Sequence, residues 1–134
     1  MKRFAHLWRS QRMARWLLIL TCFLLLACSD PPPERIIERF ENLTSLLETN
    51  KNDPDKLLKE LEGFVAEHKD DIAKDREELE ALSIDEQKEY EARYEKDMRR
   101  ALEEFLTVTL EVQDRLRSHP DKLIRFQKLL GQLR

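Results

Sequence analysis

Histidine and carboxylate side chains recur at helical spacing in one stretch of the chain, and they are the first candidates for chemistry. His68 is followed after three and seven residues by Asp71 and Asp75, so the three share one side of a helix. Imidazole nitrogens and carboxylate oxygens hold metals or polar ligands inside helical bundles. We therefore treat His68, Asp71 and Asp75 as a tentative ligand-binding set.

A metal at this set would need further ligands from a facing helix. His119 is the only other histidine after residue 27, and the neighbouring acids lack the spacing of a calcium loop. The alternative is a half-buried histidine and an aspartate that set the register of a helix seam or face solvent. We favour this alternative and predict no metal.

Residue types that support catalysis are scarce after residue 27. Only two glycines occur there, too few for a phosphate-binding loop, and no serine lies in a nucleophile motif. Carboxylates are abundant, but in a chain that is 38% charged their pairing has no specificity. We predict a non-enzymatic protein without a cofactor.

The N-terminus combines basic residues with a short apolar run. Residues 1–27 contain five bases and no acid, and residues 16–27 form the apolar run. A membrane-spanning helix needs about 20 apolar residues, so this run is short for a span. Leu25-Leu26-Ala27-Cys28 closes it, and three prolines soon follow. A basic start, a short apolar stretch and a small residue before the break are typical of a secretory signal.

The closing tetrapeptide resembles the lipobox of bacterial lipoprotein signal peptides, with Leu25 as the apolar position and Ala27 as the small one. The resemblance covers residues 1–28. It implies cleavage between Ala27 and Cys28 and a lipid on Cys28 that anchors the mature chain to a membrane. In such lipoproteins Ser29, rather than an aspartate, implies the outer membrane and a domain facing the periplasm. The alternative is an uncleaved N-terminal anchor.

These features divide the chain into a signal peptide (1–27), a lipidated N-terminus with a proline-rich tether (28–33) and a helical bundle domain (34–134). Five of the 24 bases lie in residues 1–27, so the remaining 19 bases and all 27 acids give the mature chain a formal net charge of −8. A domain this acidic is not expected to bind nucleic acid. Cys28 is its single cysteine, which leaves no disulfide.

Apolar residues at three- and four-residue steps predict helices at about 34–49, 54–82, 84–117 and 120–133, and no strand. Asp53-Pro54, Ser83 with Glu86, and His119-Pro120 have the sequence pattern of helix starts. One continuous helix through Ser83 is the alternative. We expect an all-α antiparallel bundle of three to four helices, built on a hairpin of the two long ones.

The two long helices have different apolar patterns. In the helix over 54–82 the heptad row thins to Ile72, Leu79 and Leu82, which a monomer covers poorly and which predicts self-association through this seam. In the helix over 84–117 a second row, made of Leu102, Leu106, Thr109 and Leu116, broadens the apolar face. The C-terminal half of that helix should therefore be the most buried part of the domain.

Charge is polarised along the chain. Residues 67–91 carry eleven acids and four bases, whereas residues 115–134 carry six bases and one acid. Solvated helix faces explain this pattern, and a docking surface for a basic partner or for a second copy is the functional alternative. We expect a membrane-anchored structural or protein-interaction module. A ligand-binding or metal-binding bundle, or a chaperone-like binder of exported proteins, is the alternative.

Replacing Cys28 by alanine tests the lipobox. In a bacterial host the wild type should gain the mass of a diacylglycerol group, its processing should be sensitive to globomycin, and the variant should lose both properties. Intact-mass spectrometry of the two proteins measures the difference. An unmodified, full-length wild type would instead identify residues 16–27 as an uncleaved anchor.

Overall fold

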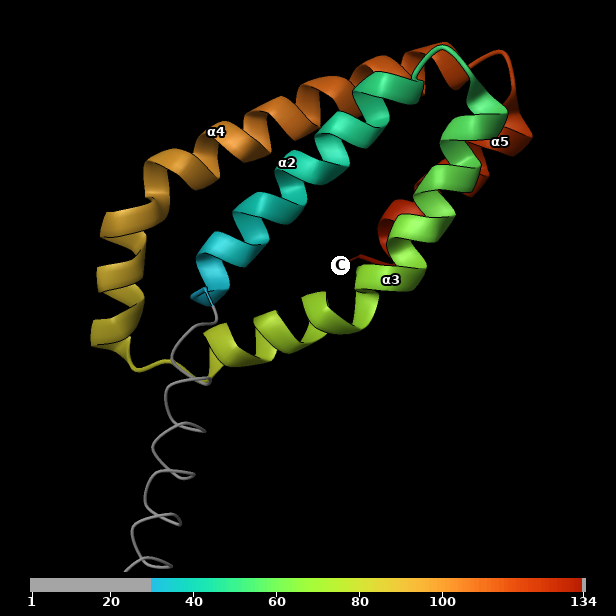
Figure 1. Cartoon of the computed structure of the whole chain (residues 1–134). Coiled ribbons are helices and arrows are strands. Elements are labelled where there is room, and N and C mark those ends of the chain that lie inside the picture. The colour runs from blue at the N-terminus through green and yellow to red at the C-terminus, as the bar shows by residue number, and fades with distance from the viewer. Residues whose placement is uncertain (1–29, 134) are drawn as a thin grey trace, which may run out of the picture. The chain divides into compact units, whose positions relative to one another are not determined.

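The computed structural model describes residues 30–133, which form helices α2 (Pro32–Asn50), α3 (Pro54–Glu80), α4 (Ile84–Leu116) and α5 (Pro120–Gly131), without a strand in that range (Figure 1). The predicted all-α class is confirmed. The predictions for the signal peptide, for cleavage at Ala27 and for the lipid on Cys28 lie outside the described residues. Residues from 31 onward make one compact unit.

The helix starts follow the sequence signals. The Asp53 side chain accepts a hydrogen bond from the Lys56 amide at 3.1 Å. Ser83 and Glu86 form a full capping box, in which Ser83 Oγ accepts from the Glu86 amide and Glu86 Oε2 accepts from the Ser83 amide. The chain therefore turns between α3 and α4, and the continuous helix through Ser83 is excluded.

The proline-rich tether is shorter than predicted. We placed residues 28–33 outside the domain, but α2 begins at Pro32, and Pro33 in its first turn is buried. Proline fits this position because the first amides of a helix have no intrahelical partner to lose. Two of the three prolines thus belong to the folded domain.

Helix α2 is the central element. It packs against both α3 and α4. Helix α5 also packs against α3 and α4, at the end of the domain away from the α3–α4 turn (Figure 1). The long helices do form an antiparallel hairpin about the tight turn, but α2 lies between its arms. The buried apolar core is Leu43, Leu47, Leu57, Leu58, Leu61, Val65, Val108, Val112, Leu116, Phe126 and Leu129.

This core lies at the end of the domain where α5 closes over α3. Helix α3 contributes four apolar residues to it, all between Leu57 and Val65. Beyond Val65 the helix bends in Figure 1, and Asp75 is its only other buried residue. The second half of α3 is therefore held by something other than an apolar core.

Gly63 is a site where the helix can be made more stable. It is exposed on α3, and a Cβ built there would meet nothing within 4 Å. The glycine is therefore not needed for a close approach to another helix. It still lowers helix propensity through its backbone freedom.

We expect Gly63→Ala to raise the free energy of unfolding by about 0.5–1 kcal/mol. Ala66→Gly, at an exposed position one turn later, should lower it by a similar amount. Urea unfolding followed by circular dichroism measures both. A loss of stability in Gly63→Ala would show that the bend of α3 requires the glycine.

Candidate binding surface

A cluster of ionised side chains connects α2 to the second half of α3. Asp75, 2% exposed, accepts hydrogen bonds from Arg35 Nε at 2.8 Å and Arg35 Nη2 at 2.6 Å, and also pairs with Arg39. Arg35 Nη2 further contacts Glu78 Oε2 at 2.5 Å. Hydrogen bonding to Asp75 raises the pKa of the Arg35 guanidinium above its ordinary value. A buried carboxylate that accepts this many hydrogen bonds holds the two helices together. We call Asp75 with Arg35 and Arg39 the clamp.

The tentative ligand-binding set is divided between different environments. Asp75 is engaged by the two arginines, whereas the Asp71 side chain is 63% exposed and lies 4.0 Å from Arg39. His68 is half-buried, and its ring lies against Phe64 with centroids 4.4 Å apart. Within residues 30–133 no three or more His, Cys, Asp or Glu side chains gather to hold a metal. Asp75 therefore matches the structural alternative, in which an aspartate sets the register of the seam.

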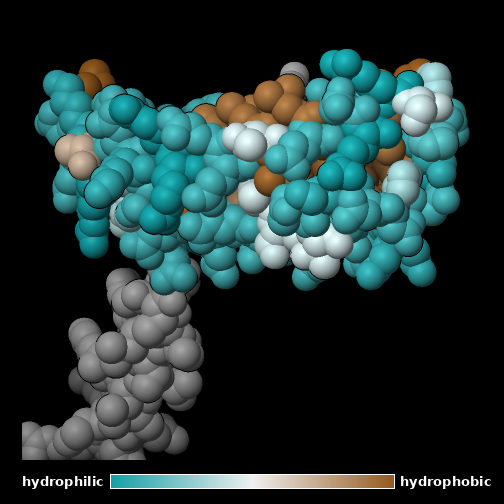
Figure 2. Space-filling model, turned by 90° about the horizontal axis from the view of Figure 1, so that it is seen from above, coloured by the Kyte–Doolittle hydropathy of each residue, from teal (hydrophilic) through white to brown (hydrophobic). Residues whose placement is uncertain are grey.

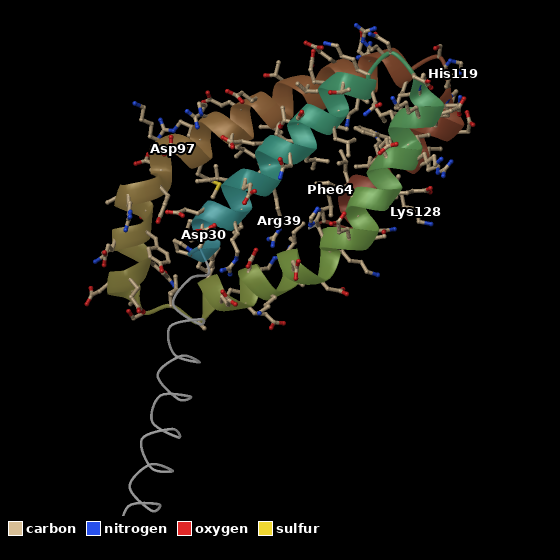
Figure 3. The ribbon with its side chains drawn as sticks, viewed as in Figure 1. Asp30, Arg39, Phe64, Asp97, His119 and Lys128 are labelled. Carbon is tan, nitrogen blue, oxygen red and sulfur yellow. The ribbon has the colours of Figure 1, made fainter. Side chains whose placement is uncertain are left out.

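An apolar cavity of about 270 Å3 lies beside the clamp, between α2 and α3. Figure 3 shows Arg39 and Phe64 extending into the space between these helices. The thin row of α3 lines this half-open cavity through Ile72 and Leu79, which are both half-buried. The chain end also reaches it, because Leu133 forms part of the wall.

A second hollow, a groove of about 630 Å3, lies between the second half of α3 and the first half of α4. The groove exists because α2 holds the two arms apart, and Pro33 of α2 lines one end of it. Tyr94 fixes α4 to α2 here, since its hydroxyl donates to Glu34 Oε1 at 2.8 Å. That hydrogen bond, with burial, raises the pKa of Tyr94. The apolar and aromatic lining residues are Pro33, Leu79, Leu82, Tyr90, Tyr94, Met98 and Leu102.

The expected burial of the C-terminal half of α4 is only partly correct. Ala101, Val108 and Val112 are buried, but Leu102, Leu106 and Leu110 are 39%, 49% and 65% exposed. Of the predicted second row, Thr109 and Leu116 are buried, whereas Leu102 and Leu106 remain exposed. Figure 2, which looks down on α4, shows an apolar area amid a mostly hydrophilic surface.

These three leucines, which we call the leucine row, recur every fourth residue along one side of α4. Leu102 also lines the groove between α3 and α4, so the leucine row and the groove form one continuous apolar surface. Isolated apolar side chains are common on protein surfaces, but a contiguous set is typical of a binding site.

Two bases near the C-terminus form ion pairs within the domain. Lys122 Nζ contacts Asp55 Oδ1 at 2.8 Å, and Arg125 Nη2 contacts Glu62 Oε1 at 2.5 Å. The hydrogen bond from Lys122, together with its charge, lowers the pKa of Asp55. Lys122 and Arg125 therefore pair with acids in the first half of α3 of the same chain.

Comparison with known protein families, curated proteins and solved structures finds no match for this chain. Among the helices described, none has the length and apolar character required to cross a membrane. Function is therefore inferred from the geometry of the domain and from the residue pattern of its N-terminus.

Sequence reasoning missed the partners of Asp75 and the exposure of the leucine row. The spacing of Arg35 and Arg39 could have predicted these partners. The two arginines lie four residues apart on one side of α2, within an apolar helix face, and such a pair of bases favours a buried acid on the facing helix. No sequence signal distinguished the exposed leucines of α4 from the buried residues beside them. All of them follow helical spacing, and only the packing of the other helices separates them.

Asp75→Ala should lower the free energy of unfolding by about 3 kcal/mol, because it leaves two partly buried guanidinium groups without their acceptor. Asp71→Ala is the matched control on the same helix, with an expected loss of about 0.5 kcal/mol or less for an exposed pair. Urea unfolding of each variant measures the two values. Equal losses would show that Asp75 does not hold α3 to α2.

Proposed function

We propose that this chain is a lipid-anchored helical lipoprotein of the bacterial cell envelope whose domain binds other protein surfaces rather than catalysing a reaction. The lipobox-like Leu25-Leu26-Ala27-Cys28 supports the anchor, and Ser29 supports the periplasmic face of the outer membrane.

The leucine row is the observation on which the binding role rests. Leucines every fourth residue on an exposed helix face match the surface that receives an amphipathic partner helix. Leu106, at the centre of the row, is 49% exposed and is flanked on either side by a leucine one turn away. We place the docking or self-association surface on this row rather than on the α3 seam, because Ile72 and Leu79 of that seam are half-buried beside α2, whereas Leu106 and Leu110 are exposed.

The test is disulfide trapping in the envelope. Leu106→Cys, in a Cys22→Ser background, should form a cross-linked adduct on mild oxidation, because its thiol would lie at the centre of the interface. Glu104→Cys is the matched control, since it is exposed and lies on the opposite side of α4. Non-reducing electrophoresis of membrane fractions resolves the products.

An adduct of twice the chain mass would identify a second copy as the partner, and a different single mass would identify another protein. Equal trapping by Leu106→Cys and Glu104→Cys would contradict docking at the leucine row. Because a disulfide needs a thiol on each partner, no trapping by either variant would contradict self-association through Leu106, where a second copy carries the second thiol. Leu106→Glu should abolish any specific complex with little effect on stability, because the side chain already reaches solvent.

A further inference from the structure

The exposed side of α4 has nearly the same residue pattern in both directions from Leu106. Leu102 and Leu110 lie four residues before and after it. Arg99 and Gln113 lie seven residues before and after it, on the same side of the helix. Gln113 is half-buried and the other four side chains are exposed. The leucine row is therefore the centre of a longer surface with polar residues at both ends.

Opposite charges end this surface. Glu95 lies eleven residues before Leu106 and Arg117 eleven residues after it, and both are exposed. Each forms an ion pair only with an exposed neighbour on the same helix, Glu95 with Arg99 and Arg117 with Asp114. Such pairs contribute little to stability, so both side chains are able to change partner at small cost. We call this side of α4, from Glu95 to Arg117, the α4 stripe.

The α4 stripe runs almost straight along the helix. Arg117 is the C-cap of α4 and keeps helical backbone angles, so the helical spacing extends to it. Between Glu95 and Arg117 the stripe repeats about every 3.7 residues, close to the 3.6 residues of a regular helical turn. It therefore stays on one side of α4 over about 33 Å. A straight partner helix is able to follow it from end to end.

We propose that the α4 stripe binds the same stripe of a second copy of this chain, with the two helices antiparallel and a two-fold axis beside Leu106. This inference rests on the docking role proposed for the leucine row and names its partner. Under that symmetry, residues at equal distances before and after Leu106 face each other. Leu106 meets its own copy, and Leu102 meets Leu110 of the second copy.

The charges at the ends select the antiparallel direction. In an antiparallel pair Glu95 faces Arg117 of the second copy, and symmetry makes this contact twice. Arg99 then faces the neutral Gln113. In a parallel pair each of the three charged residues would face its own copy, which places like charges together. Opposite charges at matched positions favour one orientation of paired helices, and like charges disfavour the other.

A second pair of charges lies on one flank of the α4 stripe. Lys96 and Asp114 are five full helical turns apart and are both exposed, so they lie on the same flank. Antiparallel two-fold pairing brings that flank against itself. Lys96 would then lie within about one residue's rise of Asp114 of the second copy. The flank therefore favours the same direction as the ends of the stripe.

The groove between α3 and α4 gives the second copy further apolar surface to cover. Leu102 lines this groove and belongs to the α4 stripe. Because Leu110 of the second copy faces Leu102, it would lie at the mouth of the groove. The pairing therefore removes from water both the exposed leucines and part of the groove beside them.

Mixed disulfide trapping in the envelope tests the direction. Two full-length chains with different tags, both in the Cys22→Ser background, carry Leu102→Cys and Leu110→Cys and are produced together. We expect an adduct that contains both tags. Each variant alone should cross-link poorly, because its two thiols would lie about eight residues, or about 12 Å, apart. The background chain without an added cysteine is the control, and tag-specific detection after non-reducing electrophoresis identifies the products.

Charge reversal tests the ends of the stripe. Glu95→Arg or Arg117→Glu, made in both tagged chains, should lower the yield of the mixed adduct roughly five-fold, because two attractive contacts become repulsive. Both substitutions together should restore the yield. Glu104→Arg makes the same charge change on the opposite side of α4 and should have no effect. Circular dichroism confirms that each variant is folded.

The proposal is overturned if no mixed adduct forms, if each cysteine variant cross-links with itself as well as with the other, or if the double charge reversal fails to restore the yield. Benzoylphenylalanine in place of Leu106 separates this failure from that of the proposed function. A photo-adduct with a different protein, and none with a second copy, would overturn the antiparallel pairing but leave docking at the leucine row. No photo-adduct of any kind would contradict both.

Discussion

The arrangement of this domain depends on one buried carboxylate. Beyond Val65, Asp75 is the only buried side chain of α3, and it is bound by Arg35 and Arg39 of α2. Burying a carboxylate is costly unless nearly all its hydrogen-bonding capacity is used, and two guanidinium groups provide that. Such a contact is directional, so it sets the register of α3 on α2 in a way that a few apolar contacts would not.

The position of α2 follows from this clamp on one side and from Tyr94 and the Phe40–Phe105 ring contact on the other. With α2 between them, the arms of the α3–α4 hairpin cannot close on each other. The cavity, the groove and the leucine row are all consequences of that separation. The same ionic contact that stabilises the fold therefore also maintains its open apolar surface.

The two ends of the domain have different physical character. Near α5, leucines and Phe126 form a conventional core, and ion pairs such as Lys122–Asp55 surround it. Between that core and the α3–α4 turn, apolar and aromatic side chains line hollows instead of filling a core. The end with fewer apolar contacts holds the two hollows, so the packed core and the open hollows occupy different parts of this small domain.

The sequence by itself determined the helices and their starts, because Asp53-Pro54, the Ser83–Glu86 box and the three- and four-residue apolar spacing act within a few residues of chain. It also determined the charge and the lipobox-like N-terminus. Only the tertiary structure decided that Asp75 is buried while Asp71 is exposed, and that Leu106 faces solvent while Val108 does not. Each pair shares one helix and its local signals, so the difference arises from where α2 lies, which no local pattern specifies.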